Sequence, residues 1–163
     1  MSTRITRALL AAAACAWTFA VGMRAAGPVM PLAPLPEAPP ALLSETGLYA
    51  DPATLAIDPR NRPFTPQYPL WSDGAAKRRW VRLPDGATID ARAIDHWEFP
   101  VGTRFWKEFA FNGRRVETRA FWKTAAGGWT FASYAWNDDQ RDARLVPADG
   151  LAQVAEVAPG KWH

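Results

Sequence analysis

The sequence predicts a mainly β domain, built as an antiparallel β-sandwich or a small barrel-like sheet, preceded by a Pro-rich linker and a short helical turn. From residue 78 onward apolar and polar residues alternate with a period of two, as expected of half-buried strands. Turn sequences such as Asn112-Gly113 separate the alternating segments. Of the nine tryptophans only Trp17 precedes residue 71, so the β segments carry eight of these large side chains for a core.

Residues 1–22 are predicted to be an export signal. The chain begins with Arg4 and Arg7 and no acidic residue, and residues 8–23 form an uncharged apolar run. A basic start followed by a short apolar run is typical of secretory signals, and this run is shorter than the ~18 residues of a membrane span. We therefore expect a periplasmic protein, attached to a membrane only through an uncleaved N-terminus or one lipidated at Cys15.

Residues 23–41 are predicted to be an extended linker, because six prolines between residues 28 and 40 prevent helix and ladder formation. The β domain is expected to span residues 42–163. It should begin with a short helical turn in residues 41–52, capped by Ser44 and ended by Gly47. Five further prolines make residues 52–69 irregular.

The alternation predicts strands over residues 78–83, 96–99, 104–111, 114–122, 129–136 and 154–158. Asn-Gly between two such segments is the strongest short hairpin signal. A hairpin closed by Asn112-Gly113 alone would pair Phe111 with Arg114. In that register the further pairs are Phe109–Val116, Glu108–Glu117, Lys107–Thr118 and Trp106–Arg119.

Composition excludes several classes of function. Cys15 is the only cysteine, and it lies in the expected signal. The mature chain would therefore have no disulfide, zinc–thiolate site or covalently attached haem. Removing the signal lowers Lys and Arg from 19 to 17 against 16 acidic residues. Nucleic-acid binding is not expected, because it requires a concentrated positive field.

Glu108 and Glu117, if directly opposed, would form a carboxylate pair of the kind that glycosidases use as acid and base. The same predicted face carries Arg104, Arg115 and Arg119. Nearby guanidinium groups lower the pKa of both carboxylates, whereas a general acid needs a raised pKa. A cross-strand ladder of salt bridges is the better interpretation.

Lys107 is predicted to lie on the apolar face, between Phe105 and Phe109. A lysine there either extends its ammonium to the edge or has a chemical role, and we favour the first. Arg119 opposite Trp106 would suit a structural cation–π contact.

No metal site is predicted. His96 and His163 are the only histidines, and a zinc site needs three or four protein ligands. The aspartates of residues 136–142 lack the spacing of an EF-hand loop, so a solvated turn is favoured over a weak calcium site. These aspartates are Asp138, Asp139 and Asp142.

Several segments resemble, in the same order, a family of exported bacterial proteins that are mostly uncharacterised, some of them described as di-haem c-type cytochromes. The segments are LSETGLYAD at 43–51, YPLWSDGAAKRRWVRLPDGATID at 68–90, FPVGTRFWKEF at 99–109, RRVETRAF at 114–121 and SYAWNDDQRDARLV at 133–146. The Cys-x-x-Cys-His haem motif of that family is absent here.

The resemblance implies a cytochrome c-like segment or protein as partner, with haem c on the partner and none attached to this chain. It implies that Lys77, Arg78, Arg79 and Lys107 face the haem, with Trp71 and Trp80 packed inward around the basic run. The expected function is a non-catalytic periplasmic domain. Two alternatives are a secreted β-sandwich that binds a sugar or another flat ligand through surface tryptophans, and a hydrolase using Glu108 and Glu117.

Overall fold

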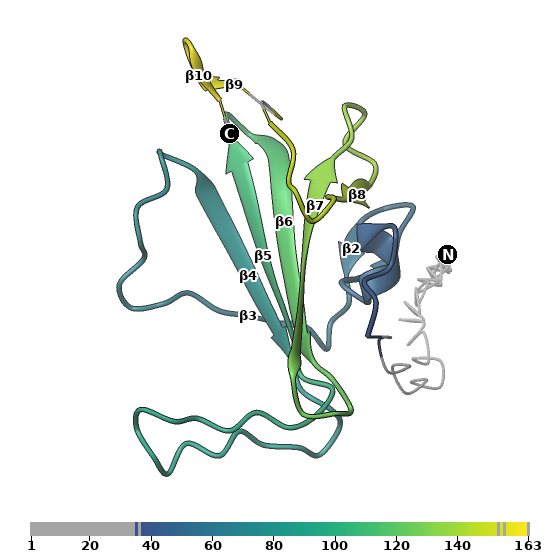
Figure 1. The fold of residues 1–163 in the computed structure, drawn as a ribbon, viewed down its shortest axis with the longest axis vertical. Helices are drawn as coiled ribbons and strands as arrows, with labels where there is room; N and C mark the ends of the chain where they lie inside the picture. The colour runs from purple at the N-terminus through teal and green to yellow at the C-terminus, as the bar shows by residue number, and fades with distance from the viewer. Residues whose placement is uncertain (1–34, 36, 153, 155, 163) are drawn as a thin grey trace, which may run out of the picture. The chain divides into compact units, whose positions relative to one another are not determined.

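The computed structural model describes residues 35, 37–152, 154 and 156–162, all within the unit formed by residues 31–163 (Figure 1). The expected export signal, residues 23–34 and 36 of the expected linker, and His163 lie outside the described residues.

Six strands form one antiparallel sheet, the main sheet, in the order β3-β4-β5-β6-β7-β8 (Figure 1). Two smaller antiparallel pairs, β1-β2 and β10-β9, and the 3₁₀ turn η1 accompany it. The predicted mainly β, antiparallel class is confirmed. The bounds are η1 Leu43–Thr46, β1 Tyr49–Asp51, β2 Ala56–Ile57, β3 Arg62–Pro63, β4 Ala76–Arg82, β5 Arg104–Phe111, β6 Arg114–Lys123, β7 Trp129–Trp136, β8 Ala143–Leu145, β9 Glu156–Ala158 and β10 Lys161–Trp162.

The long predicted strands are found, with small shifts at their ends. β5 and β7 have the predicted bounds, β6 is one residue longer, and β4 covers residues 76–82 in place of 78–83. Residues 96–99 do not form a strand, because Glu98 makes only an isolated bridge with Asp90. Gly47 ends η1 in the left-handed conformation, as predicted. Ser44 does not cap η1; it lies inside the turn and its hydroxyl donates to Asp142 at 2.6 Å.

The hairpin closes as predicted, but its register shifts by one residue along β6. Asn112 and Gly113 both have positive φ, at 49° and 77°, as a type I′ turn requires, and Phe111 pairs with Arg114. A bulge then leaves Val116 as an extra residue, so that Phe109 pairs with Glu117.

The predicted pairings beyond the bulge are therefore wrong. Trp106 pairs with Ala120, and Glu108 pairs with Thr118. Because neighbouring residues of a strand point to opposite faces, this one-residue shift reassigns every β6 side chain beyond the bulge.

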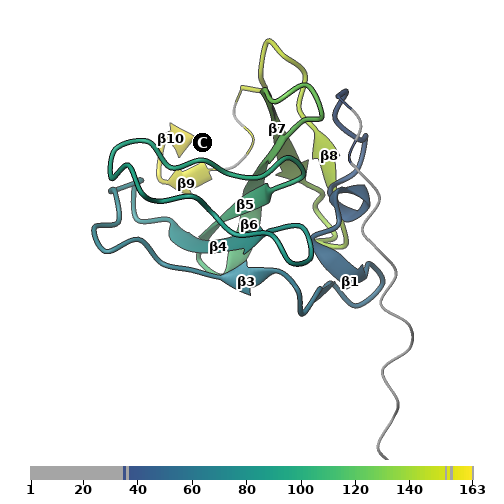
Figure 2. The same cartoon turned by 90° about the horizontal axis from the view of Figure 1, so that it is seen from below.

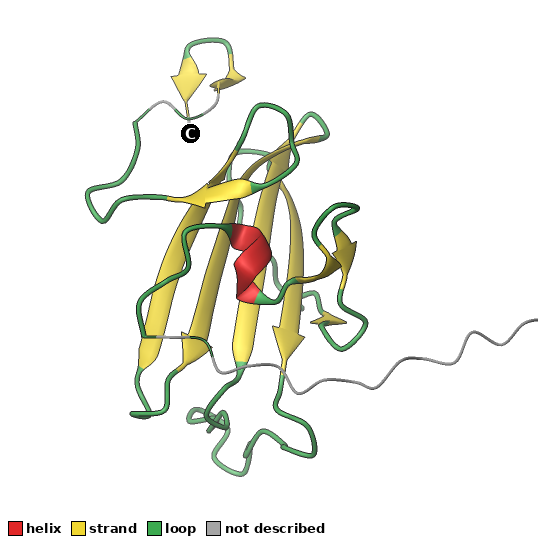
Figure 3. Ribbon diagram, turned by 90° about the vertical axis from the view of Figure 1, so that its right-hand side faces the viewer, coloured by secondary structure: helices red, strands yellow, loops and turns green. Residues whose placement is uncertain are grey.

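One face of the main sheet is covered by η1 and the segment that follows it (Figure 3). Trp106 is 1% exposed, and its indole donates to the Thr46 hydroxyl at 2.9 Å. The buried core joins the two layers through aromatic and aliphatic side chains. It consists of Leu43, Leu48, Tyr49, Trp80, Trp106, Ala120, Trp122, Tyr134, Trp136 and Ala143.

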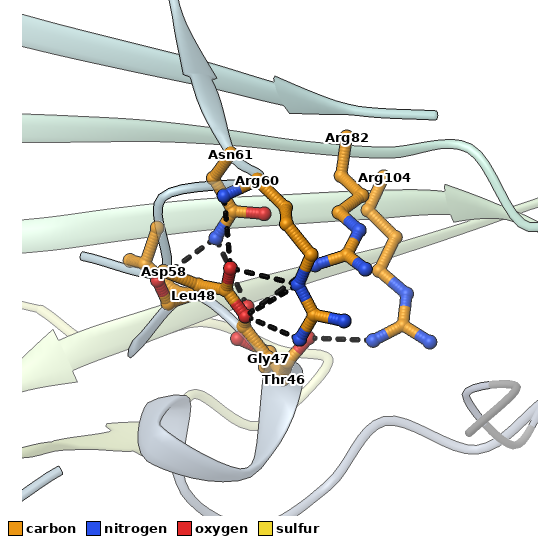
Figure 4. Close-up of polar contacts among 8 residues, drawn as sticks. All are labelled: Thr46, Gly47, Leu48, Asp58, Arg60, Asn61, Arg82 and Arg104. Atoms are coloured by element: carbon orange, nitrogen blue, oxygen red, sulfur yellow. Dashed lines mark hydrogen bonds and ion pairs between the residues drawn. The ribbon is translucent and has the colours of Figure 1, made fainter. Parts of the chain in front are cut away.

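Buried polar side chains hold the end of η1 against this covered face through hydrogen bonds (Figure 4). The Arg104 guanidinium, 3% exposed, donates to the Thr46 carbonyl at 3.1 Å. The Asn61 side-chain amide donates to the carbonyls of Gly47 at 3.0 Å and Leu48 at 2.8 Å. The carbonyls that a helical end leaves unpaired thus find donors.

Asp58 is the carboxylate of this cluster. It accepts from Arg60 at 2.7 Å and from the buried Arg82 at 3.4 Å. The hydrogen bonds from Arg60 lower the pKa of Asp58 to about 2, against the opposing effect of burial. Burial, and then the neighbouring Arg82, lower the pKa of Arg104 to about 10, so that Arg104 is still charged at neutral pH.

Candidate functional site

The face of the main sheet opposite η1 has no second layer of helix or sheet among the described residues (Figures 1 and 3). We call it the open face. The strand register arranges its side chains in rows that run across the sheet. Val81, Phe105, Phe121 and Phe131 form one row, called the aromatic row. Arg79, Lys107, Arg119 and Ser133 form the next, called the cationic row.

The aromatic row forms a packed platform. The rings of Phe105 and Phe121 stack with centroids 4.8 Å apart, and Phe121 stacks on Phe131 at 5.6 Å. Phe99 and Phe64, from the flanking loops, meet Phe105 edge-on at 5.3 Å and 6.1 Å. Phe131 nevertheless remains 70% exposed, so the platform presents apolar surface that the described chain does not cover.

The cationic row gathers three positive charges on neighbouring strands. Arg119 is paired, because its guanidinium grips Glu117 through two hydrogen bonds of 2.8 Å and 3.0 Å. Within the described chain Lys107 and Arg79 form no ion pair. The Lys107 ammonium lies 4.5 Å from the centroid of the Phe109 ring, and the Arg119 guanidinium lies 4.9 Å from the same ring.

The pKa of Lys107 is lowered, first by burial and then by Arg79, Arg119 and Lys77, with Glu117 as the opposing influence. A positive charge that is partly desolvated beside other positive charges favours the approach of an anion. This property distinguishes the cationic row from the compensated charges of the covered face.

The four residues expected to face a haem are divided between the two faces. Lys77, Arg79 and Lys107 lie on the open face, and Lys77 donates to the Leu70 carbonyl. Arg78 lies on the other face, where it binds Glu108 through hydrogen bonds of 2.9 Å and 3.1 Å. Alternation along β4 separates Arg78 from its neighbours in the sequence.

The carboxylate pair considered for hydrolysis does not form. Glu108 is buried on the covered face with Arg78, whereas Glu117 lies on the open face with Arg119. The bulge at Val116 separates the two side chains, so they cannot act on one substrate bond.

The tryptophans that flank the basic run behave differently from each other. Trp80 is buried as predicted, but Trp71 is 82% exposed, so the prediction that it packs inward is wrong. Trp71 precedes the turn in which the Ala75 amide donates to the Ser72 carbonyl at 2.8 Å, outside the strand. Its loop, residues 64–75, and the loop of residues 84–102 extend on the side of the sheet away from η1 (Figure 2).

The aspartates considered as calcium ligands instead bind other groups of the chain. Asp142 accepts from Ser44, and Asp138 pairs with Arg114 at 2.6 Å. Among the residues that the structure describes, no three histidine, cysteine or acidic side chains are grouped closely enough to hold a metal ion.

Comparison of the chain with protein-family models, curated proteins and solved structures finds no match. Within the described ranges, no helix has the length and hydropathy needed to cross a membrane.

Proposed function

We propose that this protein is a non-catalytic, exported β domain that docks a cytochrome c-like segment or protein through its open face. The observation that carries the proposal is the cationic row beside the aromatic row, with Lys107 and Arg79 unpaired within the described chain. Two expectations from the sequence support the choice of partner: the export signal, and the resemblance of several segments to a family of exported proteins, some of them described as di-haem c-type cytochromes.

The chemistry of a haem edge is complementary to these two rows. A porphyrin edge is flat and apolar and ends in two propionate carboxylates. The aromatic row offers rings for the flat surface, and Lys107 and Arg79 offer charge-assisted hydrogen bonds to the carboxylates. The sole cysteine lies within the expected signal, so the haem is assigned to the partner.

The proposal is tested by titrating the full chain with a c-type haem peptide whose propionates are free. The double variant Arg79→Gln, Lys107→Gln should weaken binding by about tenfold or more, because each lost charge-assisted bond contributes roughly 1.5–3 kcal/mol. Binding of the wild type should also fall with added salt.

The matched control is Arg114→Gln, Arg141→Gln, which removes the same charge from exposed positions outside the cationic row. Equal affinity of both double variants for the haem peptide would rule out docking through the cationic row.

A second candidate function is binding of a sugar or another flat ligand. Trp71 on its exposed loop favours it, together with the half-exposed Trp97 and Trp162. These side chains come from three separate segments, so no two of them form a shared platform through strand pairing. Loss of oligosaccharide binding in Trp71→Ala, with haem-peptide binding unchanged, would favour this candidate.

A further inference from the structure

A groove crosses the open face where β6 and β7 form its floor. It has a volume of about 690 Å³, within the range of about 300–1,000 Å³ that small-molecule sites occupy. Part of its lining follows β8 and consists of Val146, Pro147, Ala148 and Gly150. The Val146 amide donates to the Ser133 carbonyl at 2.8 Å, and the Gly150 amide donates to the Pro147 carbonyl at 2.9 Å. These bonds attach the segment to β7 and close its turn.

The groove is charged at one end and apolar along the rest. Lys107 on β5 and Arg119 on β6 line the charged end. The apolar lining includes Phe121 on β6, Phe131 on β7 and Val146 after β8. With neighbouring strands ~4.8 Å apart, the distance from β5 to β7 is about 10 Å, so the apolar part is long enough for several methylene groups.

The charge available to a ligand at this end belongs to Lys107. Arg119 is neutralised by Glu117 through two hydrogen bonds, whereas Lys107 forms no ion pair with any described residue. Arg79, its neighbour on β4, reinforces the positive potential without lining the groove. A site of this kind fits a ligand with one negative charge at one end and an apolar chain behind it.

We propose that the groove binds a free medium-chain carboxylate, with its carboxylate on the Lys107 ammonium and its alkyl chain lying across Phe121 and Phe131 toward Val146. The inference goes beyond the docking of a haem-bearing partner and does not depend on it. A sugar would need several neutral donors and acceptors, but Ser133 is the only neutral polar side chain of the lining. A phosphate monoester head, with its second negative charge, would need a second unpaired cation in the lining.

The test is isothermal titration of the full chain with decanoate below its micelle concentration. Decanol has the chain without the charge, butyrate has the charge with a short chain, and decyl phosphate has the same chain with a phosphate monoester head. We expect decanoate to bind at least tenfold more tightly than each of these three compounds. Equal affinity for decanol or decyl phosphate would show that the head is not a single carboxylate, and equal affinity for butyrate would show that the alkyl chain is not bound.

Two variants locate the site. Lys107→Met should weaken decanoate binding by tenfold or more and leave decanol unaffected, and Arg141→Met is the control for charge removed elsewhere. Ser133→Phe places a ring on the groove floor and should abolish decanoate binding while the melting temperature stays near that of the wild type. Decanoate affinity unchanged in either Lys107→Met or Ser133→Phe contradicts the proposal. The affinity of the wild type for the haem peptide is measured separately. Haem docking is therefore tested without reference to decanoate, and either proposal can fail alone.

Discussion

The two faces of the main sheet are formed by the same strands but differ in how their charged side chains are paired. On the covered face, Arg82 meets Asp58, Arg78 meets Glu108, and Arg104 donates to the Thr46 carbonyl. On the open face, Lys107 and Arg79 have no such partner among the described residues. The charges of the covered face thus find partners within the described chain, whereas the open face keeps two cations without an ion-pair partner there.

The largest expected difference between the faces is in stability. Trp106→Ala should lower the free energy of unfolding by about 3–5 kcal/mol, because it leaves a cavity in the core. It also removes the donor to the Thr46 hydroxyl. Phe131→Ala, on the open face, should lower it by less than about 1 kcal/mol. Urea denaturation of both variants measures the difference, and equal losses would show that the open face is also a core.

Lowering the pH should destabilise the fold by protonating Asp58, which lies on the covered face. The pKa of Asp58 is lowered to about 2 in the folded state, from an ordinary value of 3.8. The ionised carboxylate therefore stabilises the fold above about pH 4, and this stabilisation is lost as the pH falls through about 2. The contribution is roughly 2 kcal/mol.

Urea denaturation at pH 5, where the carboxylate is ionised in both states, and at pH 2.5, below its ordinary pKa of 3.8, checks this effect. Asp58→Asn should lose much less stability between the two pH values than the wild type. Asp149→Asn, at an exposed position, should behave like the wild type. An unchanged acid response in Asp58→Asn would show that Asp58 does not stabilise the η1 end.

A substitution in the turn between β5 and β6 should have a smaller effect on stability. Gly113→Ala introduces a side chain at φ 77°, with no atom within 4 Å of the added Cβ. The expected loss of stability is about 1 kcal/mol and arises from backbone strain alone. Gly128→Ala, where φ is not positive and the nearest atom is 3.8 Å away, is the control for replacing a turn glycine and should lose less.

The smallest expected effect on stability is that of Lys107→Met, and its sign is opposite. Removing a partly desolvated charge that has no ion-pair partner should raise the free energy of unfolding by up to about 1 kcal/mol. The same change should weaken binding of the haem peptide. Thermal melting and titration of one preparation give both results. A less stable variant would indicate that the charge of Lys107 supports the fold.

Strong local patterns were sufficient to predict much of the fold. Alternation identified β5 and β7 with their observed bounds, and Asn112-Gly113 identified the turn between β5 and β6. The bulge at Val116 could not be predicted from periodicity, because it depends on how two strands pair and not on either strand alone. β8 was missed because Ala143–Leu145 is too short for a period to be seen.

The candidate site was only partly predictable for the same reason. The basic run identified Lys77 and Arg79, and alternation identified Lys107, but Arg119 joined the row only through the shifted register. Trp71 looked like a core residue by its type, whereas its place before a turn left it in solvent. The aromatic row was not recognised, because its members come from separate strands.

The most direct measurement of the central claim is a zero-length carbodiimide cross-link between the full chain and the haem peptide. This reaction joins a lysine amine to a propionate carboxylate as an amide with loss of water, only where the two are already in contact. The chain has four lysines: Lys77, Lys107, Lys123 and Lys161. Peptide mass spectrometry should find the haem peptide attached to Lys107. Attachment to Lys161 instead, or equal labelling of all four lysines, would contradict docking through the open face.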